Sequence, residues 1–180
     1  MFWNNVPRGM NPPALVNVVV ETPLGSRIKY SAAEEHGAMV VSKLLATTFA
    51  YPANTGFFAQ CWGEDGDPLD AMVLHDAATW PGLVIRCRVI GAVKVVQRER
   101  KGPRVRNDRL MVVPEEDHRG EELKDARRLP KAMRTELEKF FAASVALKHK
   151  ELEFLGWVGA KDATKLIRAA EAKWREKHGG

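Results

Sequence analysis

The segment 63–70 (GEDGDPLD) carries the strongest chemical signal in the chain. It holds four carboxylates within seven residues: Glu64, Asp65, Asp67 and Asp70. Gly66 allows a tight turn and Pro68 fixes its own φ, so the carboxylates sit close together on a stiff loop. Crowded carboxylates repel one another unless a cation offsets their charge, and Mg²⁺ is typically held by one or two carboxylates together with substrate phosphate. Composition alone predicts either a magnesium site or a solvated acidic turn.

Short stretches of strand composition surround this turn. They are 14–21, 26–30, 38–42, 71–74, 83–90, 91–96 and 109–113, and Gly, Pro or Asp residues separate them. The first two flank Pro23-Leu24-Gly25, which predicts a hairpin. Gly102-Pro103 predicts a second, protruding hairpin over 97–109. The middle of the chain is therefore expected to be a β-structure of short strands.

The last third of the chain has helical patterns instead. Residues 130–148 begin with a proline and place Leu137, Phe140, Phe141, Val145 and Leu147 along one side. A second helix is expected over 161–177, with Leu166, Ile167, Ala170 and Trp174 on its apolar face. Strands followed by two helices predict an α+β fold in one domain over 1–180. A closed or partly closed barrel is favoured because it leaves few strand edges exposed.

Composition limits the function classes. The formal net charge is +5, and residues 97–109 alone carry about +4. This favours anionic partners, but nucleic acid is disfavoured because no aromatic residues are interleaved with the arginines. No apolar run is long enough to span a membrane, and no secretory signal pattern opens the chain, which predicts a cytoplasmic protein. The two cysteines, Cys61 and Cys87, lack metal-site spacing and are expected to be free thiols.

Four ordered segments resemble the family I inorganic pyrophosphatases. They are VVVETP with IKY (18–23 and 28–30), YPANTGF (51–57), EDGDPLDAMVL (64–74) and WPGLVIRCRVIG (80–91). The resemblance runs from about residue 5 to the C-terminus. It implies a five-stranded, OB-like β-barrel with flanking helices, and hydrolysis of diphosphate by a metal-activated water, usually in a homo-oligomer.

The resemblance also implies roles for individual residues. Asp65 and Asp70 match metal ligands, for Mg²⁺ with Mn²⁺ as an alternative, and Asp67 matches the carboxylate that helps to deprotonate the attacking water. Glu21 matches an acidic site residue and Lys29 a phosphate-binding lysine. Two further basic residues stand at substrate-binding positions with changed chemistry: Lys43 replaces an arginine and Arg109 a lysine.

Other positions depart from the family pattern. Ser31, Gln97 and Asn107 replace carboxylates that touch the metals, and Asp108 is not expected to substitute for Asn107 because neighbouring strand residues point to opposite faces. Thr55, Ser144 and Val145 replace residues around the phosphate. We therefore expect reduced activity or altered specificity, and fewer metal ions than the family pattern implies.

Three functional hypotheses follow. The first is a magnesium-dependent hydrolase of diphosphate or a related phosphoanhydride, in which the arginines of 97–109 either recruit phosphate or form a solvated charged hairpin. The second is a catalytically inactive module that binds phosphate compounds or a protein partner. The third, nucleic-acid binding by the barrel, has the least support. His75 and Asp76 resemble a catalytic pair, but a lone histidine at a strand end more often has a structural role.

Overall fold

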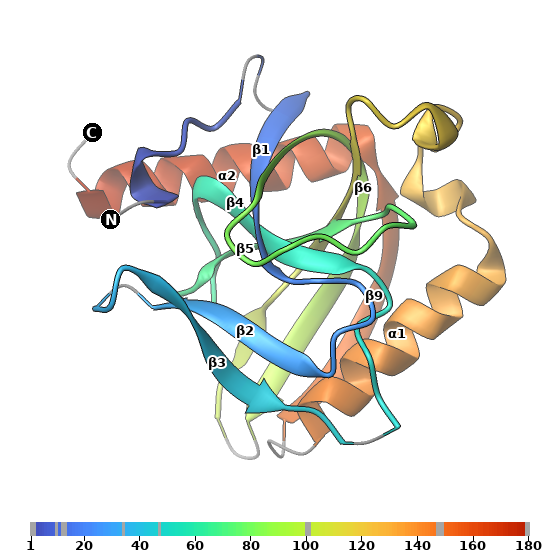
Figure 1. Cartoon of the computed structure of the whole chain (residues 1–180), viewed down its shortest axis with the longest axis horizontal. Helices are drawn as coiled ribbons and strands as arrows, with labels where there is room; N and C mark the ends of the chain where they lie inside the picture. Colours follow the sequence, from blue (N-terminus) through green and yellow to red (C-terminus); the bar gives the residue numbers. More distant parts are fainter. Residues whose placement is uncertain are drawn as a thin grey trace.

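The computed structural model describes residues 3–9, 11, 14–33, 35–46, 48–99, 102–146 and 150–178. Its strands are β1 (Leu15–Thr22), β2 (Ile28–Ala33), β3 (Ala38–Leu44), β4 (Asn54–Trp62), β5 (Pro68–Val73), β6 (Val84–Glu99), β7 (Arg104–Arg106), β8 (Arg109–Pro114) and β9 (Lys150–Gly159). Its helices are α1 (Lys131–Ala146) and α2 (Ala160–His178), with single 3₁₀ turns η1 (Trp3–Asn5), η2 (His118–Gly120) and η3 (Ala126–Arg128). Figure 1 shows the β2–β3 pair at the lower left, α1 at the right and α2 along the top.

Five strands close into a barrel. β1 pairs with β4, β4 with β5, β5 with β8, β8 with β6, and β6 returns to β1. The β5–β8 pairing is parallel and the others are antiparallel, so the barrel is mixed. Closure leaves no free edge within the ring, which removes a route to edge-to-edge association. The predicted α+β fold with an OB-like barrel and flanking helices is confirmed.

The apolar runs build two cores. One draws on all five barrel strands and on α2, which contributes Ala163, Ile167 and Ala170 from one helical face. The other lies between β5, β6, β8 and α1, where Leu137, Phe140 and Phe141 are buried. Both predicted helices are therefore confirmed, and each covers the barrel with the apolar face that the sequence indicated. Leu147, which we placed on the first helix, lies outside the described residues.

The first predicted hairpin is wrong. β1 forms ladders with β4 and β6, whereas β2 pairs with β3 in a separate two-stranded sheet. The Thr22 hydroxyl joins the two strands instead, because it accepts a hydrogen bond from Tyr30 N–H (3.0 Å) and donates one to Tyr30 O (3.3 Å). Side chains of β1, the Thr22 hydroxyl and the Glu21 carboxylate that accepts from Ala32 N–H, thus link the consecutive strands, and β2 pairs with β3.

The strand boundaries also need correction. Residues 83–90 and 91–96 form one long strand, β6, rather than two. Gly91 bends this strand without ending it: its φ is +154°, and an added Cβ would lie 2.3 Å from Val158 O. β4 and β9 were not predicted as strands. β9 pairs with β6 over nine register positions, so its conformation depends on a distant partner.

The predicted hairpin over 97–109 is confirmed by antiparallel pairing of β6 with β7, in which Gln97 faces Val105 and Arg98 faces Arg104. Cys61 and Cys87 are free and buried, as expected. In the part of the chain that is described, no helix is both long and apolar enough to cross a membrane.

Candidate functional site

The acidic turn joins β4 to β5 and is closed by its own hydrogen bonds. Gly63 N–H donates to Asp67 O (2.7 Å), and Asp67 N–H donates to the Asp65 carboxylate (3.3 Å). Gly66 has a φ of +87°, which a side chain would strain. The ladder resumes where Trp62 faces Pro68. The turn therefore holds its carboxylates on a short, internally bonded loop at the barrel rim.

A cavity of about 200 Å³ collects all the predicted site residues. Its lining includes Glu21 of β1, Lys29 of β2, Lys43 of β3, Asp65 and Asp67 of the turn, Asp70 of β5, and Arg109 of β8. The departures from the family pattern at Thr55, Gln97, Asn107, Ser144 and Val145 line the same cavity. Residues from distant parts of the chain thus converge on one concave surface, as the sequence predicted for the three aspartates, Glu21 and Lys29.

Glu21 is the most perturbed carboxyl group in this cavity. Burial, helped by the nearby charges of Asp70 and Asp67, raises its pKa to about 7. The N–H of Ala32, which donates to Glu21 at 2.9 Å, and the Lys29 ammonium act in the opposite direction. A group of this kind changes its protonation near neutral pH and is typical of a functional site.

Asp65 is perturbed in the same direction. Burial raises its pKa first, and the neighbouring Asp70 and Asp67 carboxylates add to the effect. The Asp67 N–H and the Arg109 guanidinium offset it in part. The carboxylates of the acidic turn and Asp70 therefore repel one another, and a cation bound between them would lower that repulsion.

The ligand set fits a weakly held divalent ion. Asp65 and Asp70 supply hard oxygen donors of the kind that Mg²⁺ prefers. Among the described residues, however, no three His, Cys, Asp or Glu side chains are arranged to hold one ion. Such an ion would complete its coordination with water or phosphate oxygens, which is usual for Mg²⁺.

Arg109 competes for one of these ligands. Its guanidinium lies 2.6 Å from Asp70 Oδ2, donates to Asn107 O at 2.8 Å, and stands over the Phe141 ring at 5.6 Å. The Arg109 side chain is only 13% exposed. A cation that binds Asp70 must therefore share that carboxylate with a guanidinium held in place on three sides.

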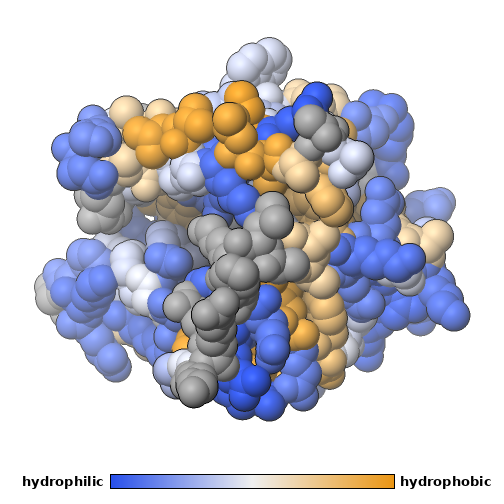
Figure 2. Space-filling view, turned by 90° about the horizontal axis from the view of Figure 1, so that it is seen from below, coloured by the Kyte–Doolittle hydropathy of each residue, from blue (hydrophilic) through white to orange (hydrophobic). Residues whose placement is uncertain are grey.

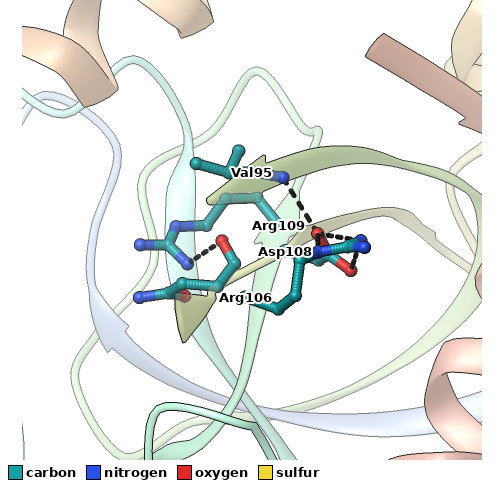
Figure 3. A network of polar contacts seen from close by, with 5 residues as sticks. Val95, Arg106, Asp108 and Arg109 are labelled. Atoms are coloured by element: carbon teal, nitrogen blue, oxygen red, sulfur yellow. Dashed lines mark hydrogen bonds and ion pairs between the residues drawn. The ribbon is translucent and has the colours of Figure 1, made fainter. Parts of the chain in front are cut away.

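Asp108 points away from the cavity, as the strand geometry predicted. It is buried and accepts a hydrogen bond from Val95 N–H (2.9 Å). It also accepts hydrogen bonds from two nitrogens of the Arg106 guanidinium, Nε and Nη2 (2.6 to 3.2 Å). Figure 3 shows Asp108 and Arg109 extending to opposite sides of the strand. The Asp108 side chain therefore holds the start of β8 against β6. Asn107 lines the cavity, but its amide brings no negative charge there.

Most of the described basic hairpin is neutralised by its own neighbours. Arg98 pairs with Glu151 at 3.0 Å, Arg104 pairs with Glu153, and Arg106 pairs with Asp108. Arg100 and Lys101 lie outside the described residues. Because glutamates of β9 offset the hairpin's charge, the hypothesis that it recruits phosphate loses much of its support.

The structure also shows what sequence reasoning missed. Lys150, at the start of β9, lines the cavity, and no motif pointed to it. Tyr51 lines it too, and burial followed by the charges of Glu21 and Asp70 raises its pKa to about 12. The motif YPANTGF indicated this region but gave Tyr51 no role. His75, by contrast, accepts a hydrogen bond from Ala77 N–H (3.1 Å), which closes a local turn and supports its structural interpretation.

Comparison with known proteins gives consistent results. A family model described as inorganic pyrophosphatase matches residues 18–175. The chain is 37% identical over 164 residues to an inorganic pyrophosphatase of Streptomyces coelicolor, covering 91% of this chain and 98% of that protein. It is 32% identical over 169 residues to one of Picrophilus torridus, covering 94% and 93%. The crystal structure of the Thermus thermophilus inorganic pyrophosphatase superposes with a TM-score of 0.87 at 32% identity, covering 96% and 98% of the two chains.

Proposed function

The chain belongs to the inorganic pyrophosphatase family, and from that premise we propose that its barrel cavity hydrolyses inorganic diphosphate to two phosphate ions. One observation carries the assignment to this cavity: four carboxylates and four basic side chains, from six strands and the acidic turn, line the same 200 Å³ space. Diphosphate needs both kinds of group. The basic groups bind its oxygens, while the carboxylates hold a cation and accept a proton from the attacking water.

Within this proposal, Asp65 and Asp70 hold the divalent cation, Mg²⁺ or Mn²⁺. When bound, the cation lowers the pKa of a water molecule and offsets the charge that develops on the phosphate. Asp67, on the exposed part of the turn, takes the proton from the attacking water. Its position between the two ligands, on a loop closed by Gly63 N–H, supports this role.

The basic residues bind and orient the substrate. Lys29 and Lys43 lie opposite each other in the β2–β3 ladder, and Lys43 Nζ also donates to Ser144 O of α1 at 3.0 Å. Arg109 reaches the cavity from β8 beside Asp70. Glu21, in its neutral form, donates a hydrogen bond to a phosphate oxygen. The two phosphates are thus held between the β2–β3 sheet and the barrel wall.

We expect this activity to be weaker than the family pattern implies. Gln97 and Asn107 bring no negative charge to this cavity, and Ser31 brings none to the adjoining cavity of about 390 Å³, although additional cations would require it. The Arg109 guanidinium also forms an ion pair with one oxygen of the Asp70 carboxylate, which a metal ion would need. Leaving-group stabilisation, which depends on the additional cations, suffers more than activation of the water.

Phosphate release tests the proposal. Purified protein is assayed with diphosphate, nucleoside triphosphate and polyphosphate, with Mg²⁺ or Mn²⁺. Asp67→Asn keeps the size of the side chain and removes its basicity, so kcat should fall by about 10²- to 10⁴-fold. Glu64→Gln is the matched control, because Glu64 is an exposed carboxylate of the same turn that does not line the cavity.

Two results would contradict the proposal. If the wild-type protein releases no phosphate from any of these substrates, the alternative of a catalytically inactive phosphate-binding module replaces it. If Asp67→Asn retains full activity, the role of Asp67 is wrong even though the family assignment stands.

We also propose that the chain acts as one domain within a cytoplasmic homo-oligomer. The family match over 18–175 supports a single domain. Apolar side chains remain exposed on the β5–β6 connection, where Trp80 is 73% exposed, and on β3, where Leu44 is 69% exposed. Seen from below, hydrophobic side chains gather along one edge of the molecule (Figure 2). Such patches are typical of association surfaces.

Light scattering of the purified protein should give a mass that is a multiple of 20.1 kDa, and Leu44→Asp should lower it. A monomer in the wild type would refute the oligomer. Cell fractionation tests the cytoplasmic location, and we expect the protein in the cytoplasmic fraction. Thermal or urea unfolding tests the single domain, for which we expect one cooperative transition.

A further inference from the structure

A second cavity adjoins the first and has different chemistry. It measures about 390 Å³, and Glu21, Lys29, Asp67 and Asp70 line both cavities. Away from this shared wall, half of its lining residues are aromatic, and we call these five the aromatic annex: Trp3, Phe57, Phe58, Trp62 and Trp174. A ligand whose phosphates lie at the shared wall could therefore extend into the annex without leaving the cavity system.

The annex is assembled from three separate parts of the chain. Trp3 lies on η1 and is 5% exposed, Trp62 ends β4, and Trp174 lies in the last turns of α2. Trp3 and Phe57 belong to one buried cluster, which gives the annex a fixed apolar base. Three indole rings brought together beside a phosphate-binding wall have no use for inorganic diphosphate, which offers only charged oxygens.

The rings of the annex already hold flat and cationic groups of this chain. The His178 imidazole stacks on Trp174 with ring centroids 4.6 Å apart and planes at 18°, and Lys177 Nζ lies 3.8 Å from the Trp62 ring centre. Each of these contacts covers one face of its indole, so a ligand in the cavity would stack on the opposite face or displace the His178 or Lys177 side chain. A nucleobase is a flat group of the same kind, and it stacks on aromatic side chains whatever its sequence identity.

We propose that the aromatic annex binds the base and sugar of a nucleoside 5′-diphosphate whose two phosphates occupy the shared wall and the first cavity. The proposal rests on the proposed function of that cavity and extends its substrate class. At the shared wall, Lys29 and the neutral Glu21 can donate hydrogen bonds to phosphate oxygens, whereas the tryptophans and phenylalanines match the uncharged base. A purely inorganic substrate would leave the larger of the two cavities empty.

The reaction balances without a further reactant. The oxygen of water forms a bond to the terminal phosphorus while the bridging oxygen–phosphorus bond breaks. A nucleoside monophosphate leaves with the bridging oxygen, inorganic phosphate is the second product, and the proton taken up by Asp67 passes to solvent. Only the group attached to the leaving phosphate differs from the reaction on diphosphate.

Binding of two non-hydrolysable analogues tests the annex separately from catalysis. Titration calorimetry with Mg²⁺ compares α,β-methylene-ADP with methylenediphosphonate, which has the same phosphorus skeleton and no nucleoside. One stacked base should make the nucleotide analogue bind roughly 5- to 150-fold more tightly. Trp174→Ala and Trp62→Ala should each reduce this ratio by about fivefold or more while the affinity for methylenediphosphonate stays the same. Trp157→Phe is the control, because Trp157 lines neither cavity.

The outcomes separate the annex from the proposed function. Three results would overturn the annex. They are equal affinities for the two analogues, an affinity ratio that both tryptophan variants leave unchanged, and no binding of either analogue. The annex would be supported if the protein converts ADP to AMP and phosphate and if Trp174→Ala slows this reaction far more than it slows diphosphate hydrolysis. If diphosphate is hydrolysed but bound ADP is not, the proposal fails as a substrate assignment while the proposed function survives.

Discussion

Replacing Glu21 with glutamine should stabilise the metal-free protein at alkaline pH. Glu21 accepts the Ala32 N–H bond, and a glutamine oxygen can accept it equally well. What the substitution removes is a negative charge in a buried position beside Asp70 and Asp67. Glutamine resembles the protonated carboxyl group, which is the form that the folded protein prefers.

The sign and size of this change in the free energy of unfolding follow from the coupling between proton binding by Glu21 and folding. The pKa of Glu21 is raised from 4.5 to about 7, so folding is favoured while Glu21 is protonated. This contribution is fully present below about pH 4.5 and is lost as the pH rises through 7. The difference of about 2.5 pKa units corresponds to about 3 kcal/mol at pH 8, as an upper bound because Glu21 is partly exposed. At pH 5 the same calculation gives less than about 1 kcal/mol.

Urea denaturation with a chelator present, at pH 5 and pH 8, measures this difference. Glu21→Gln should raise the free energy of unfolding at pH 8 by up to about 3 kcal/mol and should change it little at pH 5. Glu64→Gln, an exposed carboxylate of the acidic turn, should change it by less than about 0.5 kcal/mol at either pH. A gain of equal size at both pH values, or a loss at pH 8, would refute the reasoning.

Three further predictions concern the same cavity. Titration calorimetry without substrate should find one Mg²⁺, at most two, and Asp70→Asn should weaken that binding at least tenfold, whereas three sites of similar affinity would contradict the count. Arg109→Ala should tighten substrate-free Mg²⁺ binding and raise KM for diphosphate, because the guanidinium lies 2.6 Å from Asp70 Oδ2. If Mg²⁺ binds more weakly to that variant, the competition is absent. Asp108→Ala should lower the free energy of unfolding by about 2 kcal/mol or more, since it leaves Val95 N–H and the Arg106 guanidinium without their partner. A loss below 0.5 kcal/mol would show that the network does not stabilise β8.

The sequence determined the features that depend on neighbouring residues. Gly66 and Pro68 fix the acidic turn locally, and its hydrogen bonds run within the segment itself. The apolar spacing of Leu137, Phe140 and Phe141 fixed the buried face of α1. The order of motifs along the chain identified the candidate site, and all seven of its residues line one cavity. Their individual roles remain predictions.

Other features depended on partners that the sequence does not reveal. The hairpin expected from Pro23-Leu24-Gly25 does not form, since β1 pairs with β4 and β6 and the Thr22 hydroxyl alone joins it to Tyr30. β9 is a strand because β6 lies beside it, and position 91 of β6 requires glycine because the backbone there approaches Val158 too closely for a side chain. Strand pairing is a contact between distant segments, so local propensity cannot assign it.

Tertiary structure alone also decided the electrostatics of the site. The glutamates of β9 offset the arginines of the basic hairpin, which the sequence allowed either as a phosphate-binding surface or as a solvated charged hairpin. Arg109 became the partner of Asp70, and Glu21 acquired a pKa near neutrality through burial. Local sequence fixes which charged groups exist. The fold sets their distances and their access to water, and these two quantities determine what each charge can do.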